Sequence, residues 1–167
     1  ALFAINIKVN DEVIVPSCNF LASISPIINA GAKPVFVDVD HGSFCVSKEK
    51  ILEKITPKTK CIIIVHLWGY VVDIEPIIKL AKEKNIFVIE DSSHAHGASL
   101  KTKKVGSFGD IGCFSLQGGK AIAGGEAGIA VTDNRDLFYK MSMYGHFNRH
   151  SKLFSKDLKK YQYTGLG

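Results

Sequence analysis

Apolar and polar positions alternate along the chain in a pattern that holds from the first residues to about residue 145. Short runs rich in β-branched and other apolar residues predict strands at 12–16, 35–37, 61–65, 86–89, 111–115 and 128–132. Helical spacing predicts helices at 20–30, 48–55, 74–84 and 134–144, the first of them closed by Gly31. The unbroken apolar run at 61–65 is typical of a strand covered on both faces. Strands and helices in this order predict an α/β fold of three αβα layers around a mostly parallel sheet.

Polar residues before three of these helices are expected to cap them. Ser47 precedes the second helix, Asp73 the third, and Asp133 or Asn134 the last. Such residues accept hydrogen bonds from the free backbone N–H groups of the first helical turn.

The alternation ends near residue 145, so residues 1–145 are expected to form one α/β core. Residues 146–167 are polar and basic, and we expect a surface excursion there. The chain opens at Ala1 without an initiator Met and within an apolar pattern, and it closes at Gly167 without the character of a terminal tail. We therefore expect an internal piece of a longer protein, truncated at both ends.

The composition, with 46% hydrophobic and 22% charged residues, is that of a globular protein. No apolar run reaches 18 residues and no signal peptide is recognisable, so a cytoplasmic protein is expected. The four cysteines share no C-x-x-C spacing and are expected to be free thiols; they are Cys18, Cys45, Cys61 and Cys113. The net charge of +5 is mild, and the basic clusters at 101–104 and 156–160 predict solvated surface and no nucleic-acid partner.

Lys120 lies in the most glycine-rich stretch of the chain, residues 118–128. A phosphate-binding P-loop ending there would need Gly at position 114 and Ser or Thr at 121, where the chain has Phe114 and Ala121. Gly106, Gly109 and Gly112 are spaced G-x-x-G-x-x-G, which is not a dinucleotide fingerprint. On composition alone Lys120 is a solvated surface lysine.

Other residues give Lys120 a chemical context. Asp91 ends a predicted strand about 30 residues earlier, and Ser115 ends the strand just before the lysine loop. Ligands of such sheets gather beyond the carboxyl ends of the strands. Pyridoxal phosphate needs a lysine for its aldehyde, a carboxylate for its ring nitrogen, hydroxyl donors for its phosphate and an apolar neighbour for its ring. This chain can supply these groups in the same order with Lys120, Asp91, Ser115 and Phe20. Taken separately, Asp91 and Ser115 are ordinary turn residues and Phe20 is an ordinary core residue.

His94 and His96 follow Asp91 in a D-x-x-H-x-H pattern that could bind a metal ion. No cysteine or further carboxylate completes a tetrahedral site at a familiar spacing, so no metal is expected. We interpret His94 as a neighbour of the cofactor ring and His96 as a structural turn residue.

An ordered series of motifs over nearly the whole chain resembles the DegT/DnrJ/StrS aminotransferases. The motifs lie at residues 11–17, 31–40, 65–69, 90–98, 106–110 and 114–128. These enzymes depend on pyridoxal phosphate and mostly aminate keto sugars linked to nucleotides. The resemblance implies the large domain of the aspartate-aminotransferase fold, with both ends missing.

Carried over position by position, the resemblance makes Lys120 the catalytic Schiff-base lysine and Asp91 the partner of the ring nitrogen. It places Ser115 at the phosphate and Phe20 over the ring. His94 stands where many members have Gln. A histidine at this position resembles the subgroup that acts on keto-inositols, and so does the sequence at 115–117. Ala127 departs from the usual Gly-Glu-Gly-Gly, with little consequence expected from one methyl group.

The function implied is transfer of an amino group from glutamate or glutamine to a keto sugar, for cell-surface polysaccharide or secondary-metabolite biosynthesis, by a homodimer when the chain is full length. One alternative is a keto-inositol aminotransferase. A sugar dehydratase of the same family has histidine in place of the lysine, and Lys120 argues against it. Another alternative is a non-catalytic fragment or interaction domain, because the family's Gly-Thr phosphate turn, its Asn-x-Arg segment that reaches the partner subunit and its small C-terminal domain are not in this sequence.

Overall fold

The structure, a computed structural model, describes residues 1–144 of the 167 residues. The predicted basic cluster at 156–160 and the surface excursion at 146–167 lie outside this part of the chain. The strands are β1 (Glu12–Pro16), β2 (Lys33–Val37), β3 (Thr59–Val65), β4 (Phe87–Asp91), β5 (Ser99–Leu100), β6 (Lys103–Lys104), β7 (Ile111–Ser115) and β8 (Gly128–Val131). The helices are α1 (Ser25–Asn29), α2 (Lys48–Lys54), α3 (Glu75–Glu83) and α4 (Arg135–Met143), with short 3₁₀ helices η1 (Leu21–Ser23) and η2 (Leu67–Gly69).

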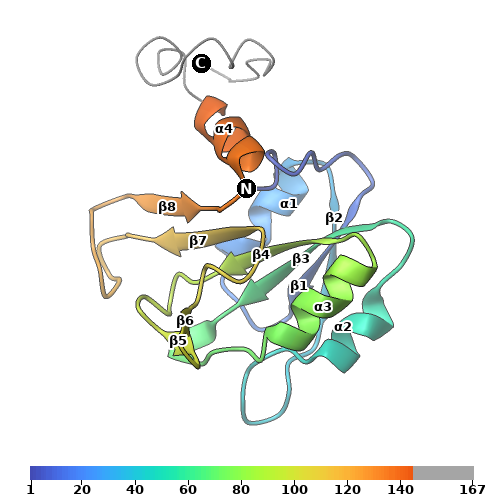
Figure 1. Cartoon of the computed structure of the whole chain (residues 1–167), viewed down its shortest axis with the longest axis horizontal. Helices are drawn as coiled ribbons and strands as arrows, with labels where there is room; N and C mark the ends of the chain where they lie inside the picture. Colours follow the sequence, from blue (N-terminus) through green and yellow to red (C-terminus); the bar gives the residue numbers. More distant parts are fainter. Residues whose placement is uncertain (145–167) are drawn as a thin grey trace.

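Six strands form one twisted sheet in the order β2-β1-β3-β4-β7-β8 (Figure 1). All neighbours are parallel except β7 and β8, which run antiparallel across the lysine loop. Val65 pairs with Asp91, and Asp91 pairs with Cys113, so β3, β4 and β7 end close together at one edge. Strands β5 and β6 form a small antiparallel hairpin that the sequence pattern does not predict.

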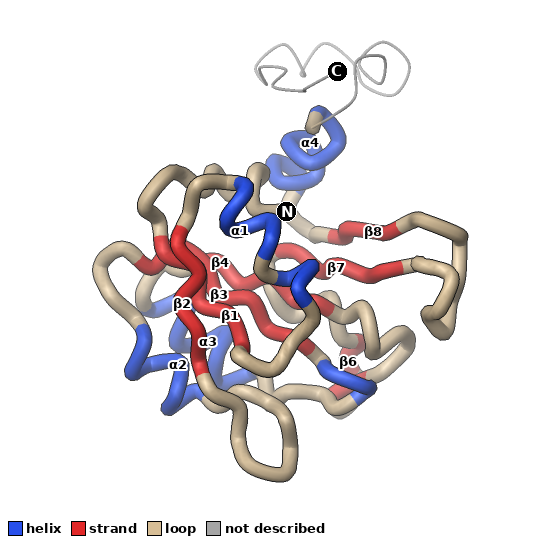
Figure 2. Tube along the Cα trace, turned by 180° about the vertical axis from the view of Figure 1, so that it is seen from behind, coloured by secondary structure: helices blue, strands red, loops and turns tan. Residues whose placement is uncertain are grey.

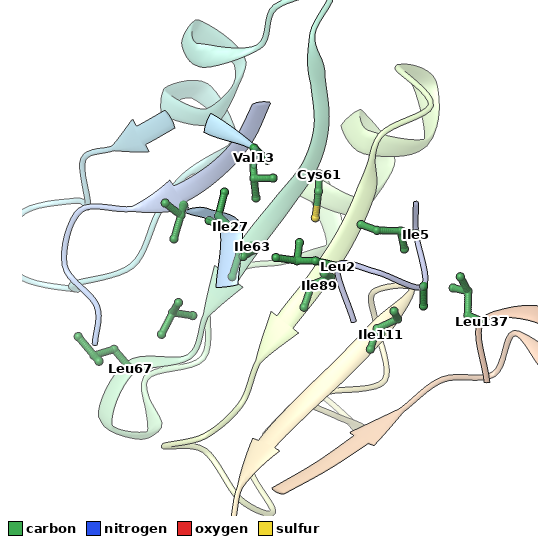
Figure 3. Close-up of a cluster of buried hydrophobic side chains, with 14 residues drawn as sticks. Leu2, Ile5, Val13, Ile27, Cys61, Ile63, Leu67, Ile89, Ile111 and Leu137 are labelled. Carbon is green, nitrogen blue, oxygen red and sulfur yellow. The ribbon is translucent and has the colours of Figure 1, made fainter. Parts of the chain in front are cut away.

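Side chains that alternate along each strand build a separate core on each face of the sheet. Val13, Val15 and Ile63 pack with the N-terminal segment, with Ile27 of α1 and with Leu137 of α4 (Figure 3). The opposite cluster packs the intervening strand residues against α2 and α3, which lie together on the other side (Figures 1 and 2). Its central members are Ile14, Ile62, Ile64, Ile51 and Ile77. The predicted three-layer α/β architecture with a mostly parallel sheet is confirmed.

The helix predicted at 20–30 is wrong as one continuous element. The chain forms η1 at Leu21–Ser23 and then the separate five-residue helix α1. Pro26 explains the division, because in a continuous helix its ring would clash with the carbonyl group of Ala22. Gly31 follows α1 with a φ of +75°, as expected for a glycine that closes a helix.

The three predicted helix caps have three different outcomes. Asn134 is confirmed, because its side-chain oxygen accepts from the N–H groups of Asp136 (2.9 Å) and Leu137 (3.2 Å). Ser47 occupies the cap position, but its hydroxyl donates to Asp40 Oδ1 (3.4 Å) and makes no cap bond. Asp73 is wrong, because Ile74 holds the cap position of α3 and Pro76 supplies the start of the helix.

The four cysteines are free, as predicted. Cys61 is fully buried within β3, and this burial is the main cause that raises the pKa of its thiol. Within residues 1–144 no helix is both long enough and apolar enough to cross a membrane.

Candidate active site

Two of the predicted site residues line the same cavity at the carboxyl edge of the sheet. Asp91 is the last residue of β4, and Ser115 is the last residue of the neighbouring strand β7. The cavity has a volume of about 960 Å³ and is also lined by Ser23 of η1, by Ser93 and by residues of the N-terminal segment. Its size is at the upper end of the range typical of small-molecule sites.

The carboxylate of Asp91 is held by one neutral donor on each oxygen. Ser23 Oγ donates to Oδ2 at 2.6 Å, and the backbone N–H of Ser93 donates to Oδ1 at 3.1 Å. Across the described part of the chain, no Lys, Arg or His nitrogen forms an ion pair with it. Because a carboxylate offers about four acceptor positions, Asp91 retains capacity for a cationic N–H group.

Lys120 and Asp91 both act electrostatically on His94. The lysine is half-buried in the loop between β7 and β8, where its backbone N–H donates to the carbonyl oxygen of Gln117 at 2.8 Å. Lys120 does not line the cavity. Its charge nevertheless acts on His94, as does the opposite charge of Asp91, so His94 lies within electrostatic reach of both.

The environment of His94 favours its uncharged ring. Partial burial is the main cause that lowers the pKa of His94, and the positive charge of Lys120 lowers it further against the opposing effect of Asp91. Its Nδ1 atom is buried and has no hydrogen-bond partner among the described residues. An unpartnered polar atom of this kind is satisfied by a water molecule or a ligand.

Phe20 and His96 have positions that separate them from the cavity. Phe20 precedes η1, is 71% exposed and does not line the cavity, so its reading as a core residue is wrong. Its place over a cofactor ring remains a prediction. The ring of His96 lies 5.7 Å from the ring of Phe114, a packing contact that suits a turn residue. Within residues 1–144 no group of three or more His, Cys, Asp or Glu side chains is arranged to bind a metal ion.

Sequence reasoning missed Glu90, which neighbours Asp91 and points to the opposite face of the sheet. Its side chain is fully buried. Oε1 accepts from the N–H groups of Phe108 (2.6 Å) and Gly109 (2.7 Å), and Oε2 accepts from the N–H of Gly106 (2.7 Å) and from His66 Nε2 (3.1 Å). A charged residue inside an otherwise apolar strand was the available signal.

His66 connects this carboxylate to Asp91. Its Nδ1 accepts from the N–H of Val72 at 3.2 Å, so the ring proton is on Nε2 and is donated to Glu90 by a neutral imidazole. The backbone N–H of His66 donates to the carbonyl oxygen of Asp91 at 3.0 Å. The residue after β3 therefore contacts the Glu90 carboxylate through its side chain and the Asp91 backbone through its N–H group.

The spacing G-x-x-G-x-x-G, which excludes a dinucleotide fingerprint, has a packing explanation. A Cβ atom at Gly112 would overlap the carbonyl oxygen of Gly106, and one at Gly109 would overlap that of Val88. Gly106 has a φ of +83° and lies against the ring of Phe114. These glycines let the loop after β6 approach β4 and β7 closely enough to donate to Glu90.

Comparison with known proteins places this chain in a family. A family model described as the DegT/DnrJ/EryC1/StrS aminotransferase family matches residues 1–167. The chain belongs to this family. It is 48% identical over 138 residues to GDP-perosamine synthase of Escherichia coli O157:H7, covering 83% of this chain and 38% of that protein. It is 39% identical over 141 residues to L-glutamine:2-deoxy-scyllo-inosose aminotransferase of Streptoalloteichus tenebrarius, covering 84% of this chain and 33% of that protein.

Solved structures of aminotransferases share the fold. The aminotransferase from Psychrobacter cryohalolentis is 44% identical with a TM-score of 0.84 and covers 86% of this chain and 37% of that one. The PLP-form of the sugar aminotransferase Spr1654 from Streptococcus pneumoniae is 30% identical with a TM-score of 0.77, covering 85% and 40%. These likenesses confirm the predicted aminotransferase fold and the pyridoxal phosphate expected of the family. The chain spans less than two-fifths of the length of the curated relatives described above.

The described residues fit this cofactor chemically. Asp91 has open acceptor capacity for a protonated ring nitrogen, and Ser115 faces the same cavity with a hydroxyl group. The hydroxyl oxygen of Ser115 accepts from the N–H of Gln117 at 3.3 Å, which leaves its proton for a phosphate oxygen. The Nδ1 atom of His94 adds a buried polar atom that has no hydrogen-bond partner within residues 1–144.

The first prediction concerns the buried carboxylate. Glu90→Gln is expected to lower the free energy of unfolding by about 3 kcal/mol, because its amide NH₂ would face at least one N–H group that now donates to the carboxylate. Urea unfolding followed by circular dichroism measures the loss. Glu83→Gln on the exposed surface of α3 is the matched control and should change stability by less than about 0.5 kcal/mol. Equal effects of the two substitutions would contradict the role given to Glu90.

The second prediction concerns pH. Burial by itself raises the pKa of Glu90, but the hydrogen bonds from His66, Gly109 and Gly106 outweigh it and lower the pKa below the usual value. A depressed folded-state pKa gives stability that is present above the unfolded-state pKa of about 4.3 and is lost as the pH falls through the folded-state pKa. The stability difference between the unaltered chain and Glu90→Gln should be constant from about pH 7 to 5 and shrink below about pH 4. A difference that grows on acidification would show that Glu90 is protonated in the folded chain.

Proposed function

We propose that the protein carrying this chain is a pyridoxal-phosphate-dependent aminotransferase that moves an amino group from glutamate or glutamine to a keto sugar. The observation that carries the proposal is the Asp91 carboxylate, held by two neutral donors and without an ion-pair partner in residues 1–144, at the wall of a cavity shared with Ser115. Family membership supports the same chemistry.

Each residue has a distinct part in the proposed reaction. When bound, the cofactor supplies an electron-withdrawing ring that stabilises negative charge on the amino donor's α-carbon. Asp91 accepts a hydrogen bond from the protonated ring nitrogen, and Ser115 Oγ donates to the phosphate. His94, with its lowered pKa, offers an uncharged ring face beside the cofactor. Lys120 Nζ would hold the cofactor at its aldehyde carbon. As a free amine it would serve as general base toward the donor's α-carbon and then return that proton as general acid.

Lys120 is proposed to reach the cofactor from outside the cavity wall. Its loop contains Gly118, Gly119, Gly124 and Gly125, and a Cβ atom at Gly118 or Gly125 would meet no atom within 4 Å. The loop has open space around it and connects two antiparallel strands that fix its ends. The lysine backbone is therefore held between two paired strands, with open space beside Gly118 and Gly125.

A nucleotide-linked keto sugar is the proposed acceptor, in biosynthesis of cell-surface polysaccharide or secondary metabolites. The similarity to GDP-perosamine synthase, at 48% identity, supports it. A keto-inositol is the second candidate, supported by the 39% identity to the inosose aminotransferase and by a histidine at position 94. We further propose a cytoplasmic homodimer, with parts of the site supplied by chain beyond these 167 residues.

If the chain is instead a non-catalytic fragment, Lys120 is not expected to react with the cofactor. The chain spans 38% of the length of GDP-perosamine synthase. Asp91, Ser115 and Lys120 nevertheless lie within one continuous fold. The catalytic proposal requires Lys120 to react with the cofactor in this chain or in the longer protein.

The third prediction tests that reaction. Incubation of the chain with pyridoxal phosphate should give the visible absorption band of a lysine-bound cofactor, and reduction with borohydride should fix the adduct on the peptide that contains Lys120. Lys120→Ala should abolish both signals, because the proposal assigns the covalent bond to this amine alone. Lys82→Ala, on the exposed surface of α3, is the matched control and should leave them unchanged.

Three outcomes separate the catalytic proposal from the non-catalytic alternative. Adduct spread over surface lysines, unchanged in Lys120→Ala, would contradict the assignment. A longer protein can be made by replacing the matching region of the E. coli relative with residues 1–144. The same result in that longer protein would reject the assignment of Lys120 there as well. An adduct at Lys120 in the longer protein alone would show that regions outside this chain supply the missing cofactor affinity.

The fourth prediction concerns the acceptor. With glutamate or glutamine present, the longer protein should aminate a GDP-linked or UDP-linked keto sugar at least tenfold faster, in kcat/KM, than a keto-inositol; such a ratio corresponds to about 1.4 kcal/mol of differential transition-state binding. Mass spectrometry of the amino product measures both rates. A preference for the keto-inositol would instead establish the second candidate.

A further inference from the structure

Ser23 makes the shortest hydrogen bond to the candidate catalytic carboxylate. Its hydroxyl donates to Asp91 Oδ2 at 2.6 Å, across 68 positions of sequence. Ser23 is only 7% exposed, and both residues line the same cavity. A short bond from a neutral hydroxyl to a carboxylate belongs to the stronger class of protein hydrogen bonds.

The backbone around Ser23 is fixed independently of Asp91. The N–H of Ser23 donates to the carbonyl oxygen of Phe20 at 3.0 Å, which closes the 3₁₀ turn η1. Pro26 prevents this turn from continuing as an α-helix, so Ser23 occupies the end of η1 and not the middle of a helix. The hydroxyl group is thus presented to Asp91 from a rigid turn.

The two donors together define the orientation of the carboxylate. Ser93 N holds Oδ1 from the same loop as Asp91, and Ser23 Oγ holds Oδ2 from the other side of the cavity. Without Ser23, only the local bond from Ser93 would resist rotation of the carboxylate about its terminal torsion, which is intrinsically soft. A ring nitrogen needs one oxygen in a fixed place, because hydrogen-bond strength falls steeply with poor alignment.

We propose that Ser23 is a positioning residue that orients Asp91 toward the ring nitrogen of the cofactor. This inference rests on the proposed function, because it assigns Ser23 a role in holding the same cofactor. Ser23 itself does not touch the reacting atoms; it acts through the carboxylate.

Titration of the lysine-dependent absorption band with pyridoxal phosphate tests the proposal. Ser23→Ala should weaken cofactor affinity about tenfold, the effect of one lost hydrogen bond to a charged group. Ser23→Thr keeps the hydroxyl and should stay within about twofold of the unaltered chain. Ser17→Ala is the matched control, because Ser17 donates to Asp38 at 3.4 Å in an exposed serine–aspartate pair away from the cavity, and it should have no effect.

A double-mutant cycle separates positioning from general packing. If Ser23 acts through Asp91, Ser23→Ala should weaken cofactor affinity about tenfold in the unaltered chain and less than about twofold in an Asp91→Ala background. The same four proteins can be compared by unfolding in the absence of cofactor. The effects of Ser23→Ala and Asp91→Ala on the unfolding equilibrium constant should then be coupled by about fivefold.

Each result has one meaning. Ser23→Ala with unchanged affinity, in a chain whose band is lost in Lys120→Ala, would overturn the role of Ser23 and leave the proposed function standing. Equal effects of Ser23→Ala with and without Asp91 would also overturn it. Absence of any lysine-dependent band both in the unaltered chain and in the longer protein would overturn both.

Discussion

The arrangement of the site depends on the burial of one carboxylate, Glu90, inside the sheet. Removing a charge from water is costly, and this charge is tolerated because three backbone N–H groups and one imidazole N–H donate to it. Those donors come from the loop after β6 and from the residue after β3. The carboxylate therefore fixes the ends of three elements relative to β4, including the start of β7, which carries Ser115.

The geometry of strand β4 links the burial of Glu90 to the position of Asp91. Successive side chains of a strand point to opposite faces, so burial of Glu90 against the loop directs Asp91 to the cavity on the other face. A shift of one residue in the register between β3 and β4 would exchange the two carboxylates. Register is held by the pairing of Val65 with Asp91 and by the bond from His66 N to the carbonyl oxygen of Asp91.

Local sequence pattern predicted elements that depend on neighbouring residues. It failed where apolar spacing was given more weight than a proline within the segment, and where distant contacts decide. The strand at 111–115 and the Asn134 cap follow from periodicity and capping chemistry, and both are confirmed. The helix at 20–30 failed because the effect of Pro26 outweighs the apolar spacing. The bond between Ser23 and Asp91 joins residues 68 positions apart, and no spacing rule reports such a contact. The close approach of Gly106 to Gly112 likewise appears only once β7 is folded against its preceding loop.

Two adjacent carboxylates on one strand thus have different parts because their acceptor positions are filled to different extents. Four protein donors occupy the acceptor positions of Glu90, so its charge is balanced within the fold and it has no capacity for a ligand. Asp91 has two neutral donors and faces a cavity, so its charge is oriented but not balanced by an ion pair within residues 1–144. A cationic ring nitrogen would complete it. The same comparison explains why Asp91, which the sequence places at a strand end like any turn residue, is the group on which the proposed chemistry depends.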